Sequence, residues 1–113
     1  MELAQKDRRT AKRYALDLPC IYRLFGRDRS VQEGHGHTRN MSSHGLLVTA
    51  GEKLATGQAV EIFIQLPRGV ADTTTTQLIV LGHVVRSDID EAGVRIVRHG
   101  FLRTEAAQTA SVQ

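Results

Sequence analysis

Residues 59–67 read AVEIFIQLP, and this stretch decides the fold class. Aliphatic residues occupy every second position and alternate with a mixed set: Val60, Ile62, Ile64 and Leu66 against Glu61, Phe63 and Gln65. A period of two is typical of a strand that buries one face. Pro67 ends the run because proline cannot donate a hydrogen bond to a sheet. The stretch therefore predicts a β-strand, the clearest one in the chain.

A similar alternation precedes this strand near the N-terminus. Its apolar positions are Tyr14, Leu16, Leu18, Cys20, Tyr22 and Leu24. A competing helical stripe through residues 11–18 is shorter, and Pro19 interrupts it. We therefore expect a strand over residues 14–24, in which Pro19 marks an edge position or a bulge.

The remaining strands are short and closely spaced. Turn residues, polar connectors or glycines separate further candidates at 31–41, 45–50, 77–89 and 93–97. Gly82 indicates a bulge or tight bend within the segment at 77–89. No helical segment lies between the strands. This order predicts an all-β, six-stranded antiparallel β-barrel over 14–102, with a polar tail at 103–113 that can add one helical turn.

Composition sets the class of the protein. The chain has 113 residues, 41% apolar and 24% charged, as expected for one globular domain. It contains no apolar run of 18 residues and no secretory signal pattern, so we expect a cytoplasmic protein without membrane insertion. Cys20 has no disulfide partner and is expected in the core. Residues 6–13 carry five basic side chains against one acid, which suits an anionic partner.

Two short motifs stand at the ends of predicted strands. RRTAKR, residues 8–13, contains Arg8, Arg9 and Arg13 just before the first strand, and NMSSHG, residues 40–45, contains Asn40, Ser42 and Gly45 before the third. The pair RRxxxR and (D/N)xSxxG resembles the PilZ domain, the bacterial receptor module for cyclic di-GMP. The resemblance covers about residues 6–102. The family more often has phenylalanine where this chain has Ile96.

The resemblance implies a stand-alone receptor that is not an enzyme, needs no cofactor and regulates an unidentified effector protein in motility, biofilm or polysaccharide control. Its ligand contacts would be the six motif residues: Arg8, Arg9, Arg13, Asn40, Ser42 and Gly45. An arginine fork suits guanine N7 and O6. Asn40 and Ser42 lie two apart, so on an extended segment they share a face. Gly45 would adopt a positive φ and admit the ligand closely. We also expect the basic arm, residues 1–13, to be mobile until ligand draws it across the barrel.

Other interpretations compete with this one. A small barrel that binds single-stranded nucleic acid through the basic arm is the main alternative, although the few aromatic residues do not cluster on one strand. A protein-interaction module that binds no ligand is a third, and the presence of both motifs disfavours it. His35, His37 and His44 could serve a metal, but their spacing favours exposed strand positions. The sequence leaves the oligomeric state open.

Overall fold

The protein is described from a computed structural model, which defines residues 14–67 and 74–105. All regular structure in these residues is β-strand. The strands are β1 (Tyr14–Ala15), β2 (Pro19–Phe25), β3 (Val31–Met41), β4 (Gly45–Ala50), β5 (Ala59–Gln65), β6 (Thr74–Ser87) and β7 (Glu91–Glu105). The alternation in residues 59–67 is confirmed as β5, which stops two residues before Pro67.

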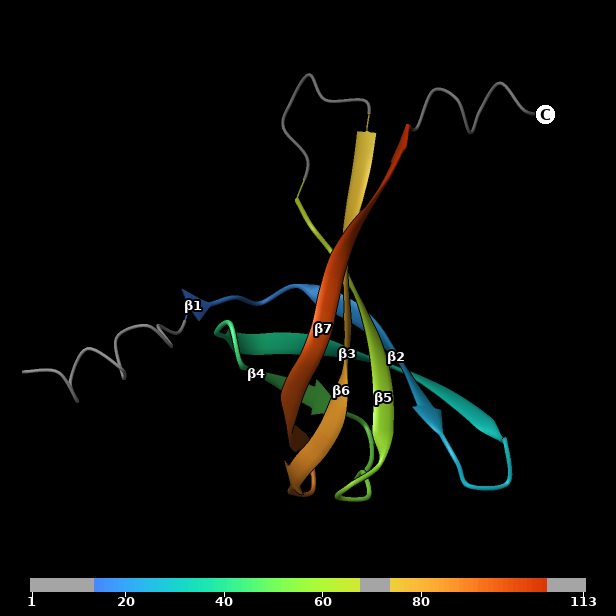
Figure 1. The fold of residues 1–113 in the computed structure, drawn as a ribbon. Coiled ribbons are helices and arrows are strands. Elements are labelled where there is room, and N and C mark those ends of the chain that lie inside the picture. Colours follow the sequence, from blue (N-terminus) through green and yellow to red (C-terminus); the bar gives the residue numbers. More distant parts are fainter. Residues whose placement is uncertain (1–13, 68–73, 106–113) are drawn as a thin grey trace, which may run out of the picture.

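The strands close into an antiparallel barrel (Figure 1). Their order in the sheet is β1-β3-β2-β5-β6-β7-β4, and a further pairing of β3 with β4 joins the two ends. The six longer strands form the barrel wall. The two-residue β1 lies beside the end of β3, where Tyr14 pairs with Met41 and Ala15 with Asn40. The predicted all-β, six-stranded antiparallel barrel is confirmed.

The core consists of the inward-facing residues of these strands. Its largest side chains with less than 2% exposure are Ile62, Ile64, Val48, Val60, Val80, Val84 and Thr38. Cys20, Tyr22 and Leu24 of β2 are also buried, as their alternation predicts. Burial of such side chains is the main favourable term in folding. Each strand therefore contributes one face to a single core.

The N-terminal alternation is not one continuous strand, so the prediction for residues 14–24 needs correction. Thr38 explains the interruption, because its buried hydroxyl replaces regular sheet pairing. The Thr38 hydroxyl donates to the Leu16 carbonyl (2.8 Å), and its oxygen accepts from the Leu18 N–H (3.0 Å). Buried backbone polar groups need such partners. The chain thus bends between β1 and β2 without leaving these groups unpaired, and Pro19 begins β2.

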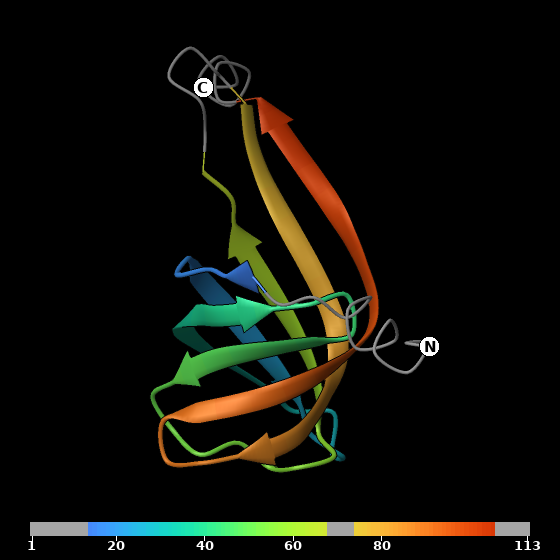
Figure 2. The same ribbon diagram turned by 90° about the vertical axis from the view of Figure 1, so that its left-hand side faces the viewer.

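The final hairpin is longer than the sequence predicts. We expected strands over 77–89 and 93–97, whereas β6 begins at Thr74 and β7 continues to Glu105. Residues 74–76, which precede the predicted strand at 77–89, therefore belong to β6, and Arg103, Thr104 and Glu105 of the predicted tail belong to β7. The outer parts of both strands extend past the barrel (Figure 2). A register shift at Leu81/Gly82 shows a bulge beside Gly82, but its extra residue is Val97 of β7, because Leu81 pairs with Arg98 and Gly82 pairs with Ile96.

Candidate functional site

A surface cavity of about 320 Å³ brings together residues from β3, β4, β6, β7 and the β3–β4 turn. Its lining residues are Asn40, Ser42, Gly45, Leu46, Leu47, Val85, Arg86, Gly93 and Val94. This volume lies in the range of small-molecule sites. Of the described residues that line the cavity, Arg86 alone is charged, so the cavity favours an anionic or acceptor-rich ligand. It holds all three of the site residues predicted from NMSSHG.

A β-bulge turns Asn40 toward this cavity. Thr38 pairs with Val48 and Asn40 pairs with Leu47, which leaves Arg39 as an extra residue in β3. Thr38 faces the core, so regular alternation would point Asn40 inward as well. The extra residue reverses the alternation, and a bulge commonly re-aims a side chain in this way. Asn40 is consequently half-buried on the outer face.

A second bulge acts on the opposite wall. Val84 pairs with Val94 and Arg86 pairs with Gly93, so Val85 is the extra residue in β6. Val84 is buried, and the bulge turns Arg86 outward instead of inward. The Arg86 side chain lies across Gly93, where an added Cβ would meet the Arg86 Cγ and Nε atoms at 3.1 Å. Glycine at position 93 therefore leaves room for the arginine to lie flat.

These two outward residues belong to one row that crosses four strands. Asn40 pairs with Leu47, Leu47 with Gly93, and Gly93 with Arg86. Three interstrand steps of about 4.8 Å place the ends of the row roughly 14 Å apart. An amide therefore stands on one side of the cavity and a guanidinium on the other. Because the Arg86 side chain already covers Gly93, a planar ligand between the two groups would lie over Leu47.

Ser42 shapes the turn at the end of the cavity. Its hydroxyl oxygen accepts hydrogen bonds from the backbone N–H groups of His44 (3.2 Å) and Gly45 (3.1 Å). The Ser42 N–H donates to the Gly45 carbonyl at 2.8 Å. The oxygen is thus occupied by the turn, and the hydroxyl proton is directed at the Gly45 carbonyl (3.5 Å), a long hydrogen bond that an acceptor on a ligand can replace. The structure adds this turn-forming role to the one expected for Ser42.

Gly45 differs from the expectation in its backbone conformation. The positive φ predicted for Gly45 is absent, since Gly57 is the glycine with positive φ among the described residues. An added Cβ at Gly45 would lie 3.5 Å from the Val94 carbonyl oxygen and 4.0 Å from the Ser42 Oγ, which are ordinary contacts. The protein itself therefore has room for a side chain here.

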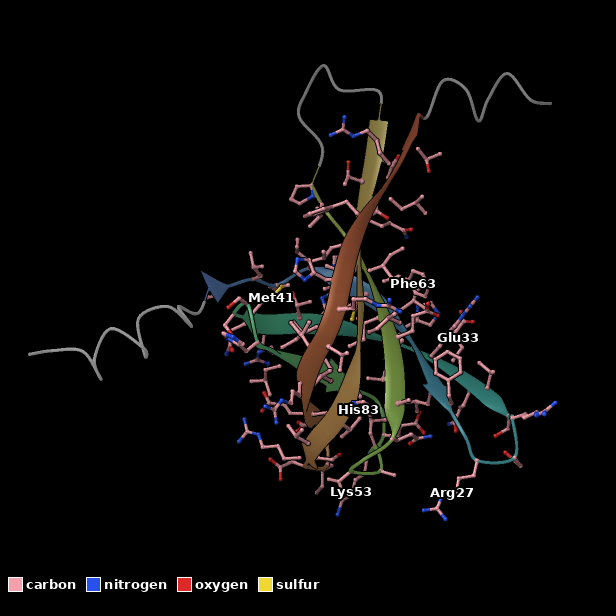
Figure 3. The ribbon with its side chains drawn as sticks, viewed as in Figure 1. Arg27, Glu33, Met41, Lys53, Phe63 and His83 are labelled. Atoms are coloured by element: carbon pink, nitrogen blue, oxygen red, sulfur yellow. The ribbon has the colours of Figure 1, made fainter. Side chains whose placement is uncertain are left out.

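The predicted arginines Arg8, Arg9 and Arg13 lie outside the described residues. The described part fixes where their segment joins the barrel, because β1 pairs with the end of β3 at Met41. Met41 lies on the opposite side of the barrel from Arg27 of the β2–β3 turn (Figure 3). The arm is thus attached beside Asn40 and the Ser42 turn, at the cavity's edge.

Arg86 is the site residue that the motifs do not indicate. In sequence it is one more polar residue at the end of GHVVRS, residues 82–87. Strict alternation from the buried Val84 would place it in the core, where an unpaired arginine is strongly disfavoured. That conflict is the one local signal for a bulge at Val85.

The other candidates from the sequence are placed as follows. His35 and His37 are exposed on β3, and the His37 Nδ1 atom lies 3.0 Å from the Asp17 carboxylate. Among the described residues, no group of three or more potential metal ligands comes together. Cys20 is buried, and this burial raises the pKa of its thiol to about 11. Within residues 14–67 and 74–105, no helix is long and apolar enough to cross a membrane.

The comparisons with known proteins agree with the two motifs. A family model described as the PilZ domain matches residues 7–108, which is nearly the whole chain. The match includes the arm arginines, the cavity and the complete barrel. A search of curated proteins finds no match.

Proposed function

Because the chain belongs to the PilZ domain family, whose members bind cyclic di-GMP, we propose that it is a receptor for this nucleotide and turns over no substrate. The observation that carries the proposal is the convergence of Asn40, Ser42, Gly45 and Arg86 on one cavity. The arm with the motif arginines is attached beside that cavity. The receptor would act on an effector protein in the cytoplasm, in control of motility, biofilm or surface polysaccharide.

The chemistry of the cavity suits a guanine nucleotide. The Asn40 amide offers a carbonyl acceptor for a guanine N–H and an NH₂ donor for O6 or a phosphate. The Ser42 hydroxyl and the Arg86 guanidinium add donors, and Arg86 can also stack on a purine face. Gly45 leaves the floor open beside Ser42. These groups would hold one guanine and one phosphate of the ligand.

The arm would supply the remaining charge. Arg13 directly precedes Tyr14, so their Cα atoms are about 3.8 Å apart in any conformation. Arg9 is five residues from Tyr14, which allows it to reach at most about 18 Å from that anchor. Because Tyr14 pairs with Met41 next to Asn40, both arginines can reach the cavity. Each charge-assisted hydrogen bond to the ligand would contribute about 1.5–3 kcal/mol before ordering costs are subtracted.

The same attachment suggests how binding changes the protein. Ligand would hold the arm across the mouth of the cavity and thereby alter the surface offered to the effector. Amide hydrogen exchange in residues 1–13 should then slow when cyclic di-GMP is added. Equal exchange with and without bound ligand would contradict the switch while leaving the binding site intact.

Calorimetric titration tests the binding itself. Cyclic di-GMP should bind with micromolar affinity or better, whereas GTP and a short single-stranded RNA should bind weakly. The double variant Arg9→Ala, Arg13→Ala should lose most of the binding, and Lys53→Ala, on the β4–β5 loop away from the cavity, is the matched charge control. Salt-sensitive binding of RNA without binding of cyclic di-GMP would instead support the nucleic-acid alternative.

A further inference from the structure

Among the described residues, no strand pairs with one edge of the outer half of β7. β4 pairs with β7 from Glu91 to Arg95, and the last contact on this side is the hydrogen bond from the Ile96 N–H to the His44 carbonyl (2.8 Å). Beyond this point β7 pairs only with β6 among the described residues. Figure 2 shows this part of the hairpin standing clear of the barrel. Within residues 14–67 and 74–105, nothing therefore occupies the backbone edge from Val97 to Arg103.

This edge also carries exposed apolar side chains. Val97, Phe101 and Leu102 are 62%, 68% and 49% exposed. Exposed strand edges are templates for further strands, and proteins usually blunt or cover them. Large exposed apolar groups on such an edge indicate an interaction surface.

We propose that the β7 edge from Val97 to Arg103 pairs with the same edge of a second copy of this chain, in an antiparallel dimer whose two-fold axis passes through Gly100. In this register the regular pairs are Gly100 with Gly100, His99 with Phe101 and Arg98 with Leu102, while Val97, the extra residue of the bulge opposite Gly82, lies beside Arg103 at the end of the pairing. Two-fold pairing of identical surfaces is the commonest symmetry of homodimers. Gly100 lies at the centre of the free segment, so this register uses the edge in full.

Charge disfavours two of the neighbouring registers. The free segment contains Arg98, His99 and Arg103 but no acid. An axis at residue 98 would place Arg98 opposite Arg98, and an axis at residue 101 would place His99 opposite Arg103. Like charges that face each other across strands are destabilising. With the axis at Gly100, every cationic side chain faces an apolar or aromatic one instead.

The contacts in this register are self-complementary. Phe101 and His99 lie on one face of β7, the face shared with Leu78 and Val80 of β6, with which they pair. The two Phe101 rings would be diagonal neighbours, about 7–8 Å apart at the backbone, with a His99 beside each. On the other face, the aliphatic stem of Arg98 would cover Leu102 of the second copy. Pairing thus covers the apolar groups that one chain leaves exposed.

Cysteine crosslinking tests the axis directly. Residues opposite each other in antiparallel strands have Cα atoms about 4.5–5.5 Å apart, within the range of a disulfide. An added Cβ at Gly100 meets no heavy atom within 4 Å, so Gly100→Cys should fold normally. The full-length variant should form a covalent dimer on mild oxidation. The native Cys20 is buried with a raised pKa and should not compete.

Leu102→Cys is the matched control on the same strand. Four residues would separate the two substituted positions along the pairing, about 14 Å, which is too far for a disulfide. It should therefore remain largely uncrosslinked under the same conditions. Equal crosslinking of the two variants, or none in either, would overturn the proposal.

Two variants of opposite charge at position 102 test the interface at equilibrium. In the dimer, Leu102→Glu faces Arg98 of the second copy and Leu102→Lys places a second cation there. Analytical ultracentrifugation of the full chain should show a dimer, and its dissociation constant should be about tenfold higher for Leu102→Lys than for Leu102→Glu. Ile89 in the β6–β7 turn is 82% exposed, so Ile89→Glu and Ile89→Lys control for net charge, and their dissociation constants should not differ.

The outcomes separate the possible occupants of the edge. A monomer at all concentrations, with fast amide exchange in residues 97–103, would refute pairing of any kind. A monomer with slow exchange there would show that another segment of the chain covers the edge, which also refutes the proposal. Because neither test uses cyclic di-GMP, both are independent of the proposed nucleotide binding.

Discussion

Gly45→Ala separates a structural role of this glycine from a role in binding. Its φ is not positive, and the added Cβ would lie 3.5 Å from its nearest neighbour outside the turn, the Val94 carbonyl oxygen. Alanine therefore fits without strain. Because alanine restricts the unfolded chain more than glycine does, we expect the free energy of unfolding to stay the same or to rise by up to about 1 kcal/mol.

Ligand binding should respond in the opposite direction. Gly45 lines the cavity, so the new methyl group would occupy space that a closely approaching nucleotide needs. Overpacking of this kind costs about 1–3 kcal/mol, which corresponds to a loss of about fivefold to more than a hundredfold in affinity. Calorimetric titration with cyclic di-GMP measures the affinity, and urea unfolding measures the stability.

Two other glycines serve as controls. Gly51→Ala adds a Cβ with no neighbour within 4 Å, so it should leave the affinity unchanged, while its free energy of unfolding should stay the same or rise as for Gly45→Ala. Gly36→Ala would bring its Cβ to 2.0 Å from the Thr49 carbonyl oxygen, so it should destabilise the β3–β4 pairing strongly. Unchanged affinity in a stable Gly45→Ala protein would refute the reasoning that the ligand approaches this glycine. A loss of affinity accompanied by a matching loss of stability would do the same.

Three further predictions follow from the geometry. Arg86→Ala should weaken cyclic di-GMP binding by about tenfold or more, and Arg86→Lys by nearly as much, because lysine lacks the planar fork of arginine. Calorimetric titration measures both affinities, and the control Arg27→Ala, at the distant β2–β3 turn, should bind normally. Thr38→Val should cost about 2–4 kcal/mol in urea unfolding, since it leaves the Leu16 carbonyl and the Leu18 N–H without their partner, while the exposed Thr56→Val should cost little. Stability should also fall in alkali, because the folded-state pKa of Cys20 is raised by burial from 9.0 to about 11 and that of Tyr22 is raised from 10.0 by burial and by Glu52. Between pH 9 and pH 11 the unfolded chain loses the Cys20 proton before the folded protein does. The contribution of Cys20 to the free energy of unfolding, about 2–3 kcal/mol, is therefore present below pH 9 and lost toward pH 11. Urea midpoints measured from pH 9 to pH 11 should fall less for Cys20→Ala than for the unchanged protein.

Much of the barrel could be predicted because strand periodicity is a local property. The bounds of β3 and β4 agree with the segments predicted at 31–41 and 45–50. The side chains of β2 and β5 alternate between buried and more exposed positions as the sequence indicates. Where alternation was absent, prediction of the bounds failed. The outer part of β7 is exposed on both faces and has no periodic pattern, so its strand structure depends on pairing with β6.

The candidate site also depends partly on local sequence and partly on tertiary structure. The sequence alone determined the fold class, the family and the residue types of the binding motifs, because buried strands need alternating apolar residues and short motifs are contiguous. Only the tertiary structure decided which of these side chains face the cavity. Bulges at Arg39 and Val85 turn Asn40 and Arg86 outward, and each bulge is defined by the register against a partner strand. Such a register depends on residues far apart in the chain, and no local pattern contains it.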